Sequence, residues 1–256
     1  MHKTGSVNMD INPIHGTPLL MIEGENGEKA LVGSDPHIGI EEEYRKKGVY
    51  IPPRWKKICS MILNAAEKNR PDRLIFLGDV KHRIAPDSER EAKWVKNFFA
   101  CLTEKVSSVE IIPGNHDGMI YHMLPENVAL HPVRGISIEN VGLVHGHAWP
   151  SPSIAARKLL IMGHVHPHVE FREEIGTRRR VPCWVRAVVS EKMAERYETY
   201  PREVIIVPPI SDLHTGCAVN MGEGVGPLFK NRLVVPEKMD IYLLNGVYLG
   251  KAADIV

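Results

Sequence analysis

Five short clusters of aspartate, asparagine and histidine lie along the first two thirds of this 256-residue chain. Each follows an apolar run: they read Asp35-Pro36-His37, Gly78-Asp79, Gly114-Asn115-His116-Asp117, His145-Gly146-His147 and Gly163-His164-Val165-His166. Imidazole nitrogens with carboxylate and amide oxygens suit divalent ions of borderline hardness, and none of the clusters contains a cysteine. Together the clusters supply enough ligands for two metal ions that share one carboxylate.

The segments between the clusters predict an α/β layered core that would bring them together. Apolar strand-like runs at 74–77 and 109–112 alternate with helical stripes over 54–69 and 92–102. In such sheets the loops at the carboxyl ends of the strands meet in one crevice, and all five clusters fall on loops of this kind. Beyond residue 167, short apolar runs favour a mainly antiparallel second sheet packed on the first.

Composition narrows the class of protein. The net charge of +1 gives no global electrostatic case for a nucleic-acid partner, and we read Arg178-Arg179-Arg180 as a solvated turn or part of a substrate rim. No apolar stretch approaches the roughly 20 residues of a membrane span. The polar start lacks an apolar signal core, and the four cysteines are scattered, which favours reduced thiols in a cytoplasmic protein. We expect one domain over residues 1–256.

The clusters differ in how specific they are. Asp-x-His is expected by chance roughly 0.5 times in this composition, whereas Gly-Asn-His-Asp is expected on the order of 0.002 times. A second Asp-x-His, Asp212/His214, is therefore read as a near-match on a loop. Taken singly, Asp35 as a helix cap or Asp79 and Asn115 as turn residues would be adequate explanations. It is the presence of all five clusters in this order that indicates a metal-binding catalytic site.

The order of the clusters resembles the calcineurin-like metallophosphoesterase superfamily over about residues 31–168. Within it the chain is most similar to an archaeal and bacterial branch that includes the ligase-associated DNA-damage phosphoesterases. That likeness rests on Asp35-Pro36-His37-Ile38-Gly39, Gly48-Val49-Tyr50-Ile51-Pro52, Gly78-Asp79-Val80-Lys81-His82 and Gly163-His164-Val165-His166-Pro167. The resemblance implies a four-layer α-β-β-α sandwich of two packed mixed sheets.

The resemblance also implies the roles of individual residues. One metal ion would be held by Asp35, His37 and His166, the second by Asn115, His145 and His164, with Asp79 bridging both. His145 comes directly after the strand-like run, which favours it over His147 as the metal ligand, and His147 would line the pocket. His116 matches the catalytic histidine, and Asp117 and His82 are expected to orient it. Mn²⁺ is the first expectation for both divalent ions, with Fe, Zn²⁺, Co²⁺ and Ni²⁺ as alternatives.

The implied function is hydrolysis of phosphodiesters, with phosphomonoesters also considered, by attack of a metal-bridging hydroxide while His116 protonates the leaving oxygen. A DNA or RNA nuclease of the same superfamily is the first alternative, which the net charge does not support. The second alternative is a non-catalytic interaction scaffold, and a purely structural metal site is the third. The expected partner is thus a phosphoester substrate rather than a membrane, and the oligomeric state is left open.

Overall fold

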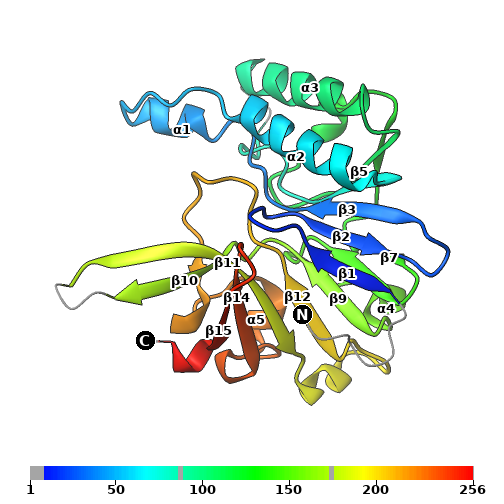
Figure 1. The fold of residues 1–256 in the computed structure, drawn as a ribbon, viewed down its shortest axis with the longest axis vertical. Helices are drawn as coiled ribbons and strands as arrows, with labels where there is room; N and C mark the ends of the chain where they lie inside the picture. The colour runs from blue at the N-terminus through cyan, green and yellow to red at the C-terminus, as the bar shows by residue number, and fades with distance from the viewer. Residues whose placement is uncertain (1–8, 86–88, 173–175, 256) are drawn as a thin grey trace.

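Two mixed β-sheets form the centre of the computed structural model, which describes residues 9–85, 89–172 and 176–255 (Figure 1). The first sheet has its six strands in sequence order. Its first three strands are antiparallel, and the strands from the third to the sixth are parallel. They are β1 (Asp10–Pro13), β2 (Leu20–Glu23), β3 (Lys29–Gly33), β4 (Arg73–Leu77), β5 (Ser108–Ile112) and β6 (Val128–Leu130).

The second sheet has the order β13-β10-β11-β12-β9-β8-β7, with β14 paired to β11 and β15 paired to β14. Within it, β8, β9 and β12 are parallel neighbours, and the hairpin of β10 and β11 is antiparallel. The strands are β7 (Ile136–Ile138), β8 (Val141–Val144), β9 (Leu159–Met162), β10 (Pro167–Arg172), β11 (Arg178–Val188), β12 (Glu203–Ile206), β13 (Cys217–Ala218), β14 (Met239–Leu243) and β15 (Tyr248–Lys251).

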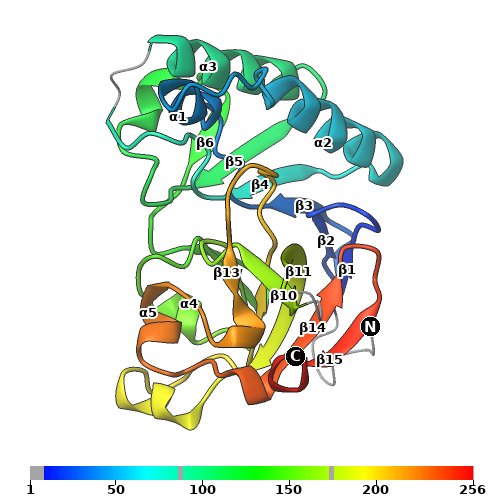
Figure 2. The ribbon, with the colours of Figure 1, turned by 90° about the vertical axis from the view of Figure 1, so that its left-hand side faces the viewer.

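Helices cover the outer faces of both sheets. Figure 2 shows α2 and α3 side by side over the first sheet, with α4 and α5 at the far side of the second. The α-helices are α1 (Glu41–Lys46), α2 (Trp55–Asn69), α3 (Glu89–Thr103), α4 (Pro152–Ala155) and α5 (Gly226–Lys230). Short 3-10 turns are η1 (Ile120–Met123), η2 (Glu191–Glu195), η3 (Val219–Met221), η4 (Pro236–Lys238) and η5 (Ala252–Asp254). No helix in the described ranges is both long and apolar enough to cross a bilayer.

Alternation of side chains along buried strands divides the core into three layers. In β4, Leu74 and Phe76 pack under α2 and α3, whereas Ile75 and Leu77 point the other way, against the second sheet. A strand turns successive side chains to opposite faces, so one apolar strand serves two core layers. A third apolar cluster lies between the second sheet and the short helices that cover it. The four-layer α-β-β-α sandwich is therefore confirmed.

Two details differ from the sequence analysis. The second sheet starts at β7 rather than beyond Pro167, because β8 and β9 pair with β12 instead of with β5 or β6. Cys59 on α2 and Cys101 on α3 are joined in a disulfide, although we expected reduced thiols. The two cysteines meet because their helices are adjacent in space, and their separation of 42 residues in the sequence does not predict the disulfide.

A partly buried ion pair links the inner strands β4 and β5, and its arginine stands at the start of β4, the opposite end of that strand from the clusters. The Arg73 guanidinium donates to both carboxylate oxygens of Glu110, at 2.6 and 2.7 Å, and His131 lies 2.7 Å from the same carboxylate. Burial raises the pKa of Glu110, but these hydrogen bonds outweigh burial and lower the pKa to about 2. A depressed carboxyl pKa stabilises the fold above the unfolded-state value and loses that effect as pH falls.

We therefore expect Glu110→Gln to lower the free energy of unfolding at pH 7 by about 2 kcal/mol. The difference from wild type should shrink as pH falls from about 4.5 towards 2, where the native carboxylate itself becomes protonated. Urea unfolding at pH 7 and pH 3 measures both quantities, with the exposed Glu104→Gln as control. An equal loss at both pH values would contradict the role of the charge.

Candidate metal centre

Four of the five clusters line one cavity of about 260 Å³ at the carboxyl ends of parallel strands, and His145 of the remaining cluster lies against Asn115 and Asp79 of that lining. The loops after β3, β4 and β5 deliver the first three clusters from the first sheet, and the loops after β8 and β9 deliver the other two from the second. The site therefore lies across the junction of the two sheets. The seven residues predicted as ligands are all brought together here: Asp35, His37, Asp79, Asn115, His145, His164 and His166.

Asp35 has one carboxylate oxygen tied to the loop and one turned to the cavity. Its Oδ2 accepts hydrogen bonds from the Ser34 hydroxyl and from the His164 backbone N–H, the latter at 3.0 Å. Its Oδ1 is buried without a hydrogen bond from the described residues and lies 3.1 Å from His166 Nε2. A buried carboxylate oxygen is costly unless it is compensated, so this orphaned atom fits a bound cation.

Asp79 lies between two groups of potential ligands. Its Oδ1 accepts the His116 backbone N–H at 2.8 Å, whereas Oδ2 lies 3.9 Å from His37 Nε2 and 3.4 Å from His145 Nε2. One group joins Asp79 with Asp35 and His37, and another joins it with His145 and His164. Within each group the ligand atoms all lie within 4.8 Å of one another. The arrangement thus allows one carboxylate to serve two cations.

The imidazoles present nitrogen atoms to this cavity. The Nδ1–H of His145 donates to the Leu77 carbonyl at 2.7 Å, which turns Nε2 inwards, 3.3 Å from Asn115 Oδ1. A backbone carbonyl is one of the partners that commonly fix a metal-binding histidine in this way. On the other side, the Nε2 atoms of His37 and His166 are 3.2 Å apart. The donor set of imidazole, carboxylate and amide without thiolate fits Mn²⁺ and the later first-row ions.

The charges of the site favour a cation. Burial raises the pKa of Asp35, but the surrounding histidines outweigh it and hold that pKa well below its usual range. Burial lowers the pKa of His37, and burial with the charge of His145 lowers the pKa of His164 to about 4. Although burial lowers the pKa of His145 too, Asp79 and Asp35 raise it to about 9. The two buried carboxylates therefore create negative charge that a metal ion would neutralise.

The backbone at these loops is locally strained. Of nine non-glycine residues with positive φ in the described ranges, five are predicted ligands: Asp35, His37, Asp79, His164 and His166. Such conformations persist where the surrounding structure enforces them, and they concentrate at functional sites. Close packing adds to the constraint, because a Cβ at Gly114 would collide with the Asp79 carboxylate and one at Gly163 with the Ser34 hydroxyl.

The predicted catalytic histidine lies on the rim of the cavity. The Nδ1–H of His116 donates to the backbone carbonyl of His82, so its Nε2 is available to a substrate. The His82 ring lies 5.7 Å from the His116 ring, centroid to centroid, and its own Nε2 is 2.8 Å from Glu43. The orienting contact therefore comes from the His82 main chain rather than from its imidazole.

Asp117 supports the loops rather than the His116 ring. Its carboxylate accepts the backbone N–H groups of Val80 and Lys81 on Oδ1 and that of Gly114 on Oδ2. Burial raises the pKa of Asp117 to about 6, against the lowering effect of the Gly114 N–H. Among the described residues its hydrogen bonds go to main-chain groups of the β4 and β5 loops, so any effect on His116 passes through the backbone.

Sequence reasoning did not place His214 at the site. It lies on the loop before β13, as expected, but its ring stacks on His37 with centroids 4.8 Å apart, and its Nδ1 is 3.0 Å from His166 Nδ1. His37, His166 and His214 form a further group that could hold a metal ion. The signal was the echo of Ser34-Asp35-Pro36-His37 in Ser211-Asp212-Leu213-His214. His147 also adjoins the site, with its ring 5.0 Å from that of His145.

Lys81 was also missed, and it supports the loop that carries His116. The residue is fully buried, and its ammonium donates to the carbonyls of His116 at 2.6 Å, of Ile84 at 3.1 Å and of Arg83. Three main-chain oxygens of two loops thus share one buried donor. No motif in the sequence marks it, because a lysine after a strand is ordinarily solvated.

Lys81→Met should destabilise the protein by about 3 kcal/mol, because three carbonyl oxygens lose their buried donor. Turnover should fall as well, since the His116 loop loses its fixed position. Urea unfolding and turnover below the transition temperature measure the two effects. The control is Lys105→Met at an exposed position, and an unchanged unfolding midpoint for Lys81→Met would show that the ammonium contributes nothing.

A two-sheet α/β sandwich with histidine, aspartate and asparagine gathered at its strand ends defines the class of metal-dependent phosphoesterases. The family model for calcineurin-like phosphoesterases matches residues 29–198. The chain belongs to this family. The predicted superfamily is confirmed, and the branch within it stays a prediction.

Comparisons with individual proteins show more distant likeness. The structure is similar to that of Pseudomonas putida nuclease MPE, with a TM-score of 0.56, 19% identity and coverage of 93% of this chain and 98% of that one. Yfce, a phosphoesterase from E. coli, gives a TM-score of 0.39 at 14% identity, with coverage of 87% and 97%. An uncharacterized HTH-type transcriptional regulator of Escherichia coli K12, YjiR, is 24% identical over 227 residues, or 81% of this chain. The chain spans 44% of the length of that curated relative.

Proposed function

We propose that the chain is a phosphodiesterase that uses two divalent metal ions, with Mn²⁺ as the first candidate. One ion would be held by Asp35, His37 and His166, the other by Asn115, His145 and His164, and Asp79 would be common to both. The observation that carries this proposal is the position of the Asp79 carboxylate, which belongs to a potential ligand group on either side. When bound, such ions supply Lewis acidity for phosphoryl oxygens and an activated water.

The residues of the chain would have separate tasks in the reaction. Ser34 and the His164 N–H fix Asp35, and the His116 N–H fixes Asp79, so each carboxylate keeps one oxygen for the ions. The Nδ1 of His116 is engaged by the His82 carbonyl, which leaves Nε2 to protonate the leaving oxygen. The role requires no covalent intermediate on the protein.

Removal and return of metal tests the proposal. Protein treated with a chelator and desalted should not hydrolyse a bis-aryl phosphodiester, and added Mn²⁺ should restore turnover with two ions per chain. Zn²⁺, Co²⁺ and Ni²⁺ in parallel rank the metals, and an aryl phosphomonoester compares the two ester classes. Bound metal without turnover on either ester would favour the scaffold alternative, and turnover in chelator would overturn the proposal.

A nuclease is the second candidate function, because a specific surface favours it. The Pseudomonas putida protein of similar fold is described as a nuclease, and a cleft with several cationic side chains adjoins the site in the present chain. Hydrolysis of a single-stranded oligonucleotide with Mn²⁺, compared with that of the small aryl diester, tests this candidate.

A further inference from the structure

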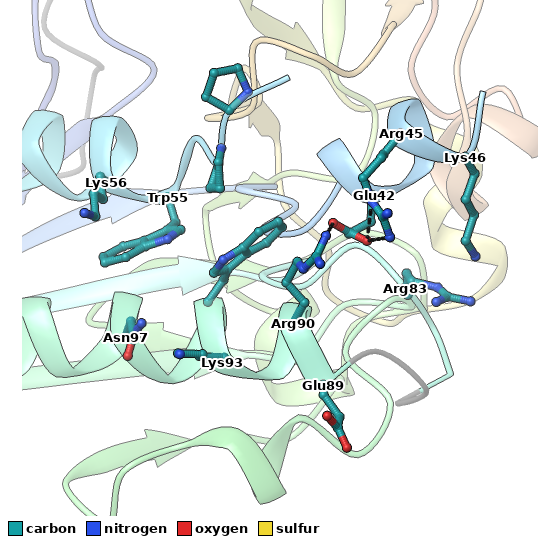
Figure 3. Close-up of a pocket in the computed structure, with 13 residues that line it drawn as sticks. Glu42, Arg45, Lys46, Trp55, Lys56, Arg83, Glu89, Arg90, Lys93 and Asn97 are labelled. Carbon is teal, nitrogen blue, oxygen red and sulfur yellow. Dashed lines mark hydrogen bonds and ion pairs between the residues drawn. The ribbon is translucent and has the colours of Figure 1, made fainter. Parts of the chain in front are cut away.

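A cleft of about 1080 Å³ lies between α1, the start of α2 and the start of α3 (Figure 3). None of the residues predicted from the sequence to bind metal or act in catalysis lines it. Its walls come from segments far apart in the chain: α1 on one side, α3 on the other, and the loop after β4 at one end. It is more than four times as large as the cavity of the metal centre.

The lining of the cleft is strongly cationic. Figure 3 shows lysine and arginine side chains from α1 and α3 around it, together with one from the loop after β4. Among the lining residues are two carboxylates, Glu42 and Glu89, and six cations: Arg45, Lys46, Lys56, Arg83, Arg90 and Lys93. The whole chain carries a net charge of only +1, so positive charge is concentrated here. A concentration of this kind attracts a polyanion even though the average charge does not.

One of the two carboxylates positions two of the cations. Glu42, whose side chain is only 8% exposed, accepts from Arg45 at 2.8 Å and from Arg90 at 3.0 Å. Both guanidinium groups remain about half exposed, and each has five N–H donors, so both can also donate to a phosphate. Lys46 and Lys93, on opposite walls, form no ion pair within the described ranges. The cleft therefore presents fixed and free cations together.

Two tryptophans lie among these cations. Trp55 at the start of α2 and Trp94 on α3 line the cleft, and both are half-buried because part of each indole packs on the core beneath the helices. If these tryptophans served only to pack the core, that role would account for the buried part of each ring. It would not account for the part that is exposed to a cationic cleft. Aromatic side chains within a positively charged groove are how proteins bind unpaired bases without sequence preference.

Residues that line the cleft are next in sequence to residues near the metal centre. Arg83 lines the cleft, while the adjacent His82 has its ring 5.4 Å from that of His37. Glu43, which accepts from His82 at 2.8 Å, follows Glu42 of the cleft wall. The loop after β4 and helix α1 therefore contribute residues both to the cleft and to the surroundings of the metal centre.

We propose that this cleft binds the single-stranded polynucleotide that flanks the scissile phosphodiester, with Trp55 and Trp94 stacking on bases and the lysines and arginines contacting phosphates. The proposal rests on the phosphodiesterase function proposed above, because it names that enzyme's substrate class. A duplex would not offer free base faces to recessed tryptophans, so the single strand is favoured. DNA and RNA share this chemistry, and the experiment separates them.

Binding of fluorescein-labelled dT20 and U20 in metal-free buffer, followed by anisotropy over a range of salt, tests the proposal without cleavage. Lys46→Gln combined with Lys93→Gln should weaken binding about tenfold and reduce the slope of log K against log salt by about 1.4, the share of two phosphate contacts. Trp55→Leu and Trp94→Leu should each weaken binding about tenfold. The matched control, Lys68→Gln with Lys96→Gln, removes two exposed lysines of α2 and α3 outside the cleft and should bind like wild type.

The other possible results of the binding and hydrolysis measurements also decide between the proposals. Equal binding by the cleft and control variants, or no binding of either oligonucleotide at low salt, overturns the proposal. Competition by polyglutamate as strong as by dT20 would assign the cleft to an acidic peptide instead. Hydrolysis of the bis-aryl diester is measured on the same preparations. If the protein binds oligonucleotides through the cleft but does not hydrolyse the diester, the proposed function is wrong and the cleft proposal stands. If it hydrolyses the diester normally but binds no oligonucleotide, the cleft proposal is wrong and the proposed function stands.

Discussion

Asp79→Asn is expected to reduce hydrolysis of a bis-aryl phosphodiester on the order of 10³-fold and to remove most of the bound manganese. Asp79 faces both groups of potential ligands, so loss of its charge should weaken both ions together rather than one. Asparagine tolerates the left-handed backbone that residue 79 adopts at a φ of 49°, and its amide oxygen can still accept the His116 N–H. The fold should therefore survive the substitution.

Metal content per chain after desalting and turnover with added Mn²⁺ are the two measurements for Asp79→Asn. The control is Asp10→Asn, an exposed aspartate at the edge of the first sheet, which should retain both properties. Wild-type activity with two bound ions in Asp79→Asn would refute a shared carboxylate. Loss of one ion with the other retained would confine Asp79 to a single metal.

His116→Gln should have the opposite signature, because His116 is proposed as an acid and not as a ligand. Metal content should stay at the wild-type level while turnover falls about 10²- to 10⁴-fold. The loss should be larger for an ester with an unsubstituted phenolate leaving group than for one with nitrophenolate, since the poorer leaving group needs the proton more. Glutamine can keep a hydrogen bond to the His82 carbonyl, which limits rearrangement of the loop.

Two comparisons make the His116 experiment decisive. His122→Gln alters an exposed histidine on η1, a few residues further along the chain, and should change neither quantity. Metal loss in His116→Gln would identify His116 as a ligand. An equal loss of rate for both leaving groups would exclude proton transfer as its contribution.

Most of the fold could be predicted because its apolar patterns are local. The apolar stripe over residues 54–69 corresponds to α2, and the short runs at 74–77 and 109–112 correspond to β4 and β5 within a residue. Which strands pair depends on contacts distant in sequence, so the position of β8 and β9 in the second sheet was not predicted. The disulfide between Cys59 and Cys101 likewise depends on how two helices pack.

The candidate site likewise contains residues that the sequence could predict and residues that it could not. Residues inside ordered motifs, such as Asp35 and His164, could be singled out because several types recur together at strand ends. His214 could not, because its loop reaches the site only through the fold, where Ser34 pairs with Pro209. Lys81 acts on main-chain carbonyls, which carry no sequence signal. The ligand roles, the native metal and the cytoplasmic location stay predictions, as does the extent of the domain.

The junction between the two sheets has a mechanical consequence. Asp35, Asp79 and Asn115 follow strands of one sheet, and His145, His164 and His166 follow strands of the other. A pair of bound ions would fasten the layers at one end, while Trp184 and its apolar neighbours hold them together in the middle. Sliding of one layer over the other would then stretch the coordination shell. Substitutions in that distant apolar interface should accordingly register as weaker metal affinity, and metal loading should raise the melting temperature of the whole sandwich.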